Sequence, residues 1–583
     1  MSLFWSADDS VKVGETKISI PSENGLSYSP GQKISIFVDP STKYMDGRES
    51  YLDFNVKLSL PAGATPTRLQ LDKVGGSILI RNIRIYDGTR GNLLEEINAY
   101  DTYVACKYDY DKDRSLENMR ALREGASVHQ PANRGTTGST QSAMANTMTN
   151  PYFKQTSGNQ TTAFADSDFL NAKVCIPLHT GIFANSETIF PVMLTGGLYI
   201  EIDLNDGPAV IKQLDSVLQE RRLTLNPQFG SIDGSAAVWA AAGTSNKVFL
   251  DTDNSIVGTD MVAKCPFVVG ETVNFALSAN NSSTSVLSAP AKILQINACA
   301  TNSRVEVVFD ATLTNNGVAI NANWSMYSTA VAAGTYDATY TVSNVNLIIS
   351  QVQLNSEYES GMMAKVRDGR AIEFDIYSTT NYKHSILPSD RQTTFQIFAQ
   401  NSRAKSLLVV PTDSSVYTSG QQISGTGTYV IRGTSNASTA LADKDIQDVC
   451  LTNNRSQYTG VIDELSSIQY TIAGQRVPSR EISVKKIATK NSIDAMHLFE
   501  LEKTLDNSGI PPKSFSSFLT NFCFGRGFSA GGQNGVMDLR GKDLAVVLRY
   551  QTAVAPTVGK LFNSFVFHIA RLVIRNGDVE VIQ

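Results

Sequence analysis

The residues most suggestive of chemistry are Cys175 and His179, in the stretch VCIPLHTG. In an extended strand, residues four apart lie on one face, so a thiol–imidazole dyad or half of a metal site is conceivable. A dyad also needs a third group that orients the imidazole, and a tetrahedral metal needs two further ligands. We therefore expect a buried thiol and an imidazole at the end of a strand.

A second pattern, DYDKD, resembles the start of a calcium loop, with Asp109, Asp111 and Asp113 at alternate positions. An EF-hand also needs glycine at its sixth position and glutamate at its twelfth. Arg114 and Arg120 occupy those positions here. The pattern therefore favours a solvated, charged entry to a helix over a metal site.

Two further stretches could serve catalysis or phosphate binding. Glu373 and Asp375 share one face of IEFDIY, as a glycosidase pair requires, but carboxylates two apart on one strand are typical of a solvent-exposed face. CFGRGFSAGGQNG is rich in glycine but lacks the Lys-Ser/Thr of a phosphate-binding loop, so a corner of a sheet explains it. We nominate no catalytic residue, no metal ligand and no cofactor.

Composition places the 583-residue chain among ordinary globular proteins. It is 42% hydrophobic and 18% charged, with a net charge of −5, which is far from the basic excess of a nucleic-acid binder. We therefore expect no sequence-specific binding of nucleic acid. Six scattered cysteines without a C-x-x-C pair indicate a reducing compartment, and the start MSLFWSADDSVKVGE does not read as a signal peptide.

Alternation of apolar and polar residues dominates the chain. In YLDFNVKLSL, five apolar residues from Leu52 to Leu60 alternate with polar ones, and the segments 34–38, 198–204 and 544–548 repeat the pattern. Such strands have one buried and one exposed face, which is typical of antiparallel sheets. Helical signals are confined to 113–126 and 211–223. The sequence predicts an all-β fold of sandwiches or barrels.

Three segments interrupt these strands. Residues 127–168 predict a long polar loop, 225–340 a small β insertion with strands in KVFLDTD, ETVNFALSA and SRVEVVFDATL, and 411–440 a shorter polar loop. Long surface insertions cost little closure entropy and often carry recognition. A boundary between two units is expected at 359–371.

The order of motifs in the second half carries a resemblance to a known family. A strand with the apolar run AKSLLVV (404–410) is followed by a strand closing in a glycine turn (472–476), and then by the aromatic strand and glycine-rich corner at 522–539. This order resembles the second jelly roll of the double jelly-roll major capsid proteins of icosahedral DNA viruses. SILIRNIRIYDGTRGNLLEEINAYDTY is similar to the strand, turn and helix of the first jelly roll, and VNLIISQVQLNSEYESGM to its closing strand. The virophage and Polinton-like group is the most similar in length.

The resemblance implies two antiparallel eight-stranded jelly rolls side by side: an arm at 1–20, a first jelly roll at 21–362 and a second at 371–583. It implies a structural protein without enzymatic activity or cofactor, which forms homotrimers that tile an icosahedral shell. Neighbouring capsomers, penton proteins and minor capsid proteins would be its partners, in virions assembled in the cytoplasm of the host cell. Whether a membrane lies inside the shell is left undecided by the resemblance. The alternatives are a carbohydrate-binding adhesin and a hydrolase with paired carboxylates in a cleft between two jelly rolls.

One detail supports a duplicated unit. RIYDGTRGNLLEEI and YTIAGQRVPSREI each end a strand in a Gly-x-Arg turn, and Gly88 and Arg90 lie 386 positions before Gly474 and Arg476. We expect these turns to be equivalent corners of two related sandwiches. The inward positions differ by one residue relative to the glycine, however, and a slip of one residue reverses every side chain of a strand.

Overall fold

The fold was analysed in a computed structural model of the chain. It describes residues 12–59, 68–71, 74–111, 120, 123–125, 172–184, 189–214, 231–232, 246–251, 272–276, 291–299, 304–310, 325–328, 339–387, 390–413, 465–484, 486–487, 492–493, 495–512, 522–528, 536–550, 560–575 and 578–583. The expected loop at 127–168 lies outside these residues, as does 414–440 of the loop expected at 411–440.

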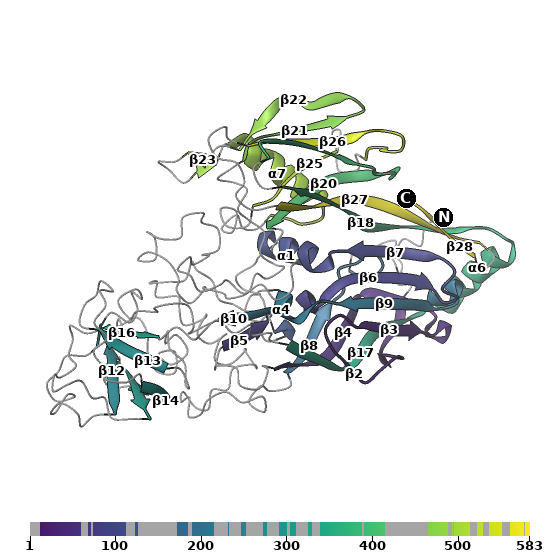
Figure 1. Ribbon diagram of the computed structural model, residues 1–583. Coiled ribbons are helices and arrows are strands. Elements are labelled where there is room, and N and C mark those ends of the chain that lie inside the picture. Colours follow the sequence, from purple (N-terminus) through teal and green to yellow (C-terminus); the bar gives the residue numbers. More distant parts are fainter. Residues whose placement is uncertain are drawn as a thin grey trace.

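The first sandwich consists of two antiparallel sheets (Figure 1). One has the order β1 (Lys12–Pro21), β17 (Thr339–Leu354), β4 (Met45–Ser59) and β8 (Ala172–Pro177), with β2 (Ser27–Tyr28) paired to β17. The other has the order β3 (Lys33–Val38), β9 (Leu198–Leu204), β6 (Ile80–Asp87) and β7 (Leu93–Asn98).

The second sandwich repeats this arrangement. One sheet has the order β18 (Ile372–Ile386), β27 (Lys560–Arg575), β20 (Ala404–Asp413) and β25 (Phe524–Gly527), with β28 (Asp578–Ile582) paired to β27. The other has the order β19 (Gln392–Ile397), β26 (Leu544–Tyr550), β21 (Leu465–Ile472) and β22 (Gln475–Ser483).

The strand order identifies both sandwiches as jelly rolls. When the eight strands of each sandwich are counted along the chain, the sheets read 1-8-3-6 and 2-7-4-5 in both halves. This interleaving of two Greek keys is the jelly-roll topology. The expectation of two antiparallel eight-stranded jelly rolls is therefore confirmed, and in Figure 1 they lie side by side.

The alternating segments form the buried faces that their pattern predicts. In β4, the side chains of Leu52, Phe54, Val56 and Leu58 are buried. Ile34, Ile36 and Val38 of β3 and the Leu544, Val546 and Leu548 side chains of β26 are likewise buried. These residues belong to one continuous core that includes both sandwiches.

A β insertion separates the last two strands of the first jelly roll. Its sheet has the order β11 (Ser231–Ile232), β12 (Lys247–Asp251), β15 (Arg304–Phe309), β14 (Ala291–Cys299), β13 (Thr272–Ala276) and β16 (Ser325–Ser328), and it lies apart from both sandwiches in Figure 1. The sequence predicts the strands β12, β13 and β15. Where the chain leaves and re-enters the sandwich, the Tyr340 hydroxyl donates to the carbonyl oxygen of Asn205, whose Nδ2 donates to Asp101 at 3.0 Å.

The described helices are not those that periodicity predicts. They are α1 (Tyr100–Tyr110), α4 (Gly207–Val210), α6 (Ser356–Arg367) and α7 (Ala495–Asn507). The helix expected at 211–223 is wrong at Ile211–Leu214, which form β10 and pair with β5 (Arg68–Leu71). The helix expected at 113–126 falls mostly outside the described residues, but Arg120, Arg123 and Glu124, which the structure describes, are helical. The expected boundary at 359–371 overlaps α6, which links β17 to β18.

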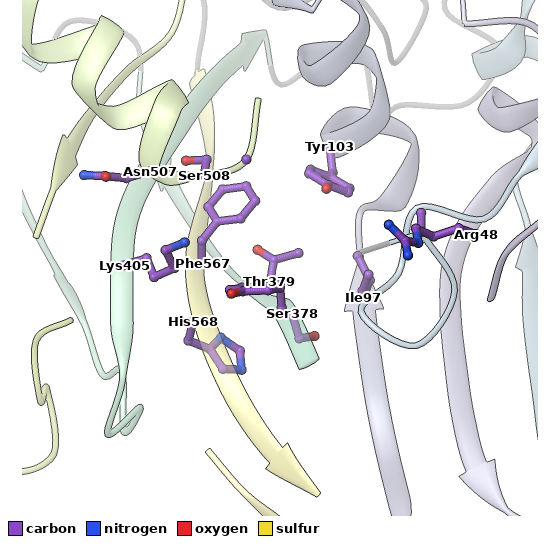
Figure 2. A pocket seen from close by; sticks show the side chains of 13 residues that line it. Arg48, Ile97, Tyr103, Ser378, Thr379, Lys405, Asn507, Ser508, Phe567 and His568 are labelled. Atoms are coloured by element: carbon purple, nitrogen blue, oxygen red, sulfur yellow. The ribbon is translucent and has the colours of Figure 1, made fainter. Parts of the chain in front are cut away.

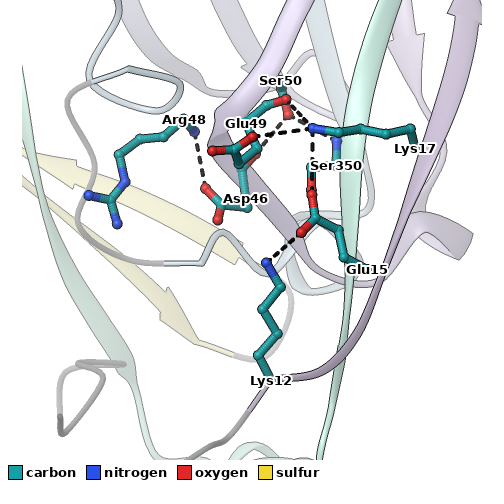
Figure 3. Close-up of polar contacts among 8 residues, drawn as sticks. All are labelled: Lys12, Glu15, Lys17, Asp46, Arg48, Glu49, Ser50 and Ser350. Carbon is teal, nitrogen blue, oxygen red and sulfur yellow. Dashed lines mark hydrogen bonds and ion pairs between the residues drawn. The ribbon is translucent and has the colours of Figure 1, made fainter.

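The segment 12–20, expected to belong to an arm, is instead part of the first sandwich. It forms β1, which pairs with β17. Figure 3 shows how polar contacts fix this strand: Glu15 accepts hydrogen bonds from Lys12 Nζ, at 2.7 Å, and from the Ser350 hydroxyl. Lys17 Nζ donates to the carbonyl oxygen of Glu49 at 2.6 Å, which connects β1 to β4. An edge strand that pairs with β17 and also contacts β4 is not a detached arm.

The Gly-x-Arg turns connect the fourth and fifth strands of their jelly rolls, but they differ in construction. In the first, Gly88 NH donates to the carbonyl oxygen of Thr195 at 3.1 Å, Arg90 has a φ of 59°, and its guanidinium lies 3.3 Å from the ring centroid of Tyr199. A Cβ on Gly88 would overlap the backbone of Gly196.

The second turn needs glycine for a different reason. Gly474 has a φ of 76° and open space around it, and Ala473 also has a positive φ. Arg476 lies within β22 and is exposed. Common descent of the two corners stays a proposal.

We predict that Gly88→Ala lowers the free energy of unfolding by about 1–3 kcal/mol, because the added methyl group must displace the backbone at Gly196. Gly361→Ala is the matched control, since nothing lies near a Cβ at that position in α6 and alanine favours a helix. Thermal melts followed by circular dichroism would compare the two. Equal melting temperatures would contradict the close approach at Gly88.

Candidate functional site

Cys175 and His179 do not form a dyad. The Cys175 thiol donates to Asp53 Oδ1 at 3.6 Å, and burial together with this carboxylate raises the pKa of Cys175. His179 lies beyond the end of β8, where Nε2 is 3.0 Å from the Tyr108 hydroxyl. Burial lowers the pKa of His179 well below its usual value. The thiol is thus kept protonated and the imidazole neutral, each by its own surroundings.

The aspartates of DYDKD belong to the end of a helix. Asp109 is buried within α1, and Asp111 caps its C-terminus, 3.7 Å from Lys107 Nζ, while Asp113 lies outside the described residues. Among the residues that the structure describes, no group of three or more His, Cys, Asp and Glu side chains could hold a metal ion. Within the same residues, no helix is long and apolar enough to cross a membrane.

Glu373 and Asp375 form ion pairs on the outer face of β18. Arg571, on the neighbouring β27, lies 3.3 Å from Glu373 and 3.0 Å from Asp375. Arg403 adds a second contact to Asp375, at 2.7 Å. Both carboxylates are therefore engaged by arginine. In the glycine-rich corner, Gly525 packs against the carbonyl oxygen of Leu407, and 529–535 lie outside the described residues.

The feature that distinguishes this molecule is the junction between its two jelly rolls. Tyr103 of α1 lies 5.8 Å from Phe567 and 6.0 Å from Phe565, both on β27, measured between ring centroids. Phe190 of the first jelly roll meets Phe374 of β18 edge to face at 5.3 Å. Aromatic pairs of this kind contribute beyond the area that they bury, so the two sandwiches are joined by a core rather than by a loose contact.

A buried carboxylate crosses this junction. Glu95 of β7 accepts hydrogen bonds from the backbone of Gly181, at 2.6 Å, and of Ile182, at 3.1 Å, and from the Ser378 hydroxyl on β18, at 2.7 Å. Burial raises the pKa of Glu95, and these hydrogen bonds oppose that shift. One side chain thereby positions a loop of the first jelly roll and a strand of the second.

A cavity of about 360 Å³ lies beside Glu95, between the two jelly rolls (Figure 2). Ile97, Tyr103 and Arg48 line it from the first jelly roll. Thr379 and His568 line it from β18 and β27 of the second, and the end of α7 and Lys405 of β20 complete it. The hydrolase alternative requires paired carboxylates at this place, whereas none of the described lining residues is an aspartate or a glutamate.

Two polar atoms in this lining are buried without a partner among the described residues. They are Thr379 Oγ1 and His568 Nε2, on side chains that are 3% and 2% exposed. The other imidazole nitrogen, His568 Nδ1, lies 3.2 Å from the carbonyl oxygen of Val566. Burial lowers the pKa of His568 to about 4, so the imidazole is neutral at pH 7.

Sequence reasoning missed Glu95, Thr379 and His568. Glu95 reads as a polar residue after a turn, because its partners lie 86 and 283 positions away. The strand pattern of IEFDIYSTT does not indicate that Thr379 is buried against another layer of the structure. A histidine inside the apolar run SFVFHIARLVI was the available signal for His568.

Comparisons with known proteins found similar solved structures at low sequence identity. No protein-family model matches the chain, and no curated protein matches its sequence. Among solved structures, it is similar to the Faustovirus major capsid protein, with 9% identity over 98% of this chain and 93% of that one and a TM-score of 0.49. It is also similar to a quasi-atomic model of the PBCV-1 virus capsid, with 11% identity over all of both chains and a TM-score of 0.47. The mavirus major capsid protein matches with 10% identity over 99% of this chain and 93% of that one, and a TM-score of 0.34. The fold assignment rests on the strand order.

We predict that Glu95→Ala lowers the free energy of unfolding by about 3 kcal/mol, because three buried donors lose their acceptor. Glu96→Ala is the control. Its carboxylate pairs with Arg84 at a partly exposed position, where a loss of about 0.5 kcal/mol is expected. Urea denaturation followed by circular dichroism measures both. A Glu95 variant as stable as the Glu96 variant would refute the role of the junction carboxylate.

A second prediction concerns acid. The pKa of His568 is about 4 in the folded protein and near 6.5 in the unfolded chain, so the unfolded state takes up a proton first as the pH falls. The stabilisation from the neutral imidazole is complete above pH 6.5 and is lost between pH 6.5 and 4, by about 3 kcal/mol. In His568→Gln, the free energy of unfolding should depend less steeply on pH in that window. Parallel pH profiles of the variant and the wild type would contradict the buried neutral state.

Proposed function

We propose that the chain is a structural major capsid protein of an icosahedral DNA virus. The observation that carries the proposal is the repeated strand order: two jelly rolls with the same topology, fixed side by side by a shared core. A fixed pair of similar units is a rigid building block, and its junction consists of apolar packing and a structural carboxylate. The order of motifs along the chain points to the same family. On this reading, the protein has no enzymatic activity.

We further propose that three copies assemble into a homotrimer. Three copies of a double jelly roll present six similar sandwiches around a threefold axis, which gives a nearly hexagonal outline that can tile a flat face. Closed symmetric oligomers of this kind are the usual solution for homo-oligomers. Neighbouring trimers would form the face, and penton and minor capsid proteins would fill its corners and seams. The protein would then reside in the virion, assembled in the cytoplasm of the host cell.

The insertion fits the outward side of such a shell. The six-stranded sheet β11–β16 stands on one side of the molecule in Figure 1, and the last strand, β28, lies on the opposite side. If the ends of the jelly rolls face inward, the insertion faces the medium. We therefore assign the insertion to the exterior of the virion.

We predict that the purified protein behaves as a trimer. The monomer is 63.2 kDa, so light scattering coupled to size-exclusion chromatography should give three times that mass, about 190 kDa. Interfaces that hold such an assembly bury well over about 1,000 Å² each, so the mass should persist on dilution into the micromolar range. A monomer at every concentration would overturn the proposal, and so would turnover of oligosaccharides by the purified protein.

A further inference from the structure

The outer sheet of the second jelly roll ends in a strand with an open edge. β19 pairs with β26 on one side, and no described strand pairs with its other side. Tyr550 NH donates to the carbonyl oxygen of Arg391 at 2.8 Å. Hydrogen-bonded pairs alternate along an antiparallel ladder, so the NH and C=O groups of Gln392, Thr394 and Gln396 point away from β26. The side chains of these three residues are exposed, and the sheet lies on the side of the molecule away from the first jelly roll (Figure 1).

The corresponding edge of the first jelly roll is covered by its own chain. β3 holds the place of β19 there, and Glu23 NH donates to the carbonyl oxygen of Ser35 at 2.9 Å. Ser35 NH donates to Asn24 Oδ1 at 2.9 Å, and Asn24 Nδ2 donates to the carbonyl oxygen of Lys33 at 2.7 Å. The covering segment belongs to the connection between β1 and β3, which spans residues 22–32, whereas only residues 387–391 connect β18 to β19. Among the described residues, nothing covers β19 in this way.

β19 also lacks the features that protect an edge strand from other chains. Natural edge strands carry charges, proline or a bulge. β22, at the opposite edge of the same sheet, has Pro478, Arg480 and a register shift, and β1 has Lys12, Lys17 and a register shift. The sequence of β19, QTTFQI, has no charge, proline or glycine, and its ladder with β26 is regular. Such a strand is suited to extension of its sheet by a further strand.

The side chains of β19 match a second copy of β19. When two antiparallel copies meet with Thr394 opposite Thr394, Gln392 of each copy faces Gln396 of the other. The outward NH and C=O groups of all three residues then form hydrogen bonds between the copies. Threonines that face each other across a ladder stabilise it, and the amide side chains of glutamine can donate to and accept from each other. Because these residues are uncharged, like charges do not oppose the pairing.

Exposed apolar side chains flank the strand at both ends. Leu387 is 72% exposed and Phe398 is 67% exposed. In the symmetric register, Phe398 of one copy lies opposite residue 390 of the other, so it comes next to the 387–391 connection that carries Leu387. Twofold symmetry makes this contact twice. The apolar area that it buries adds to the hydrogen bonds of the ladder.

We propose that two copies of the chain pair through β19, antiparallel and centred on Thr394, so that two four-stranded sheets become one sheet of eight strands. The same surface of both copies forms the contact, as in other twofold contacts between identical chains. It differs from the threefold contact of the proposed trimer and does not depend on a capsid role. A contact of one strand per copy is smaller than the interfaces of stable complexes, so the pairing is weak in dilute solution and covalent trapping is the way to detect it.

Cysteine trapping tests the register. At the centre of the pair, the two Cα atoms lie about 5.5 Å apart, within the range that a disulfide spans. Native Thr394→Cys, concentrated and treated with oxidised glutathione, should therefore form a disulfide between copies, with a band at twice the 63.2-kDa chain mass in a non-reducing gel. Gln392→Cys and Gln396→Cys should each give little dimer alone but cross-link when mixed, because each faces the other. The wild type measures the background from the native cysteines.

Charge at the centre gives a second measurement. Thr394→Lys places two lysines opposite each other, so in the mixed Gln392→Cys and Gln396→Cys chains it should lower the yield of cross-link about fivefold. Thr471→Lys is the control, because Thr471 shares the outer face but lies on the interior strand β21. When one chain carries Thr394→Lys and the other Thr394→Glu, opposite charges face each other and the yield should recover. Circular dichroism of each variant checks that it is folded.

Three outcomes would overturn the inference. They are no dimer of Thr394→Cys above the wild-type background, equal dimer from all three single-cysteine variants, as random collision would give, and cross-linking that Thr394→Lys leaves unchanged. The first outcome is also the one expected if this edge takes a strand of a different protein. Light scattering of the wild type decides the proposed trimer separately, because the trapped contact is twofold.

Discussion

Residues 562–568 of β27 are buried on both faces of their strand, and this constraint organises the molecule. One face closes the core of the second jelly roll, where Phe562 packs against Phe395 of β19 and Phe524 of β25. The other meets the first jelly roll, where Phe565 and Phe567 pack against Tyr103. A two-layer sandwich normally exposes its outer faces to water, so a strand that is apolar on both sides needs a third layer. The first jelly roll supplies that layer.

Polar groups at the junction follow from the same constraint. Once β7 and β18 face each other, any carboxylate or hydroxyl between them must find its partner there, because water is excluded. Glu95 does so completely, with donors from two separate segments of the chain. Thr379 and His568 do not, within the described residues, and they mark the place where the packing of the two jelly rolls leaves a cavity. The hydrogen-bonded Glu95 and the cavity at Thr379 and His568 therefore lie next to each other in the junction.

How far the sequence predicts the fold depends on how many sides of an element are buried. Strands with one buried face, such as β3 and β4, can be predicted from the alternation of apolar and polar residues. Helix α1 is buried on nearly all sides, so its residues show no 3.6-residue period, and only the resemblance to the first jelly roll indicated a helix after β7. Helix α7 does carry a signal, since His497, Leu501 and Leu505 recur every four residues, and it was overlooked. The segment Ile211–Leu214 has helical spacing but pairs with β5, because tertiary pairing overrides a short local pattern.

The residues of the candidate site could not be predicted from short sequence motifs, for a related reason. Cys175, His179, Glu373 and Asp375 attract notice because they are close together in the sequence, and each is occupied by a nearby structural partner. Glu95 bonds to residues 86 to 283 positions away, and Thr379 and His568 meet one cavity from two strands far apart in the sequence, which only the packing of the two jelly rolls reveals.

The pinned exit and return of the β insertion have an evolutionary consequence. The chain leaves the first jelly roll at Asn205 and comes back at Tyr340, and a hydrogen bond joins these two residues directly. Because departure and return are fastened to each other, the chain that follows β10 and precedes Tyr340 can be lengthened, shortened or exchanged while both jelly rolls keep their shape; Val210 and Ile211, before it, belong to the core. Lineages that share this scaffold are free to diversify that segment quickly, and an engineer could graft a foreign domain there.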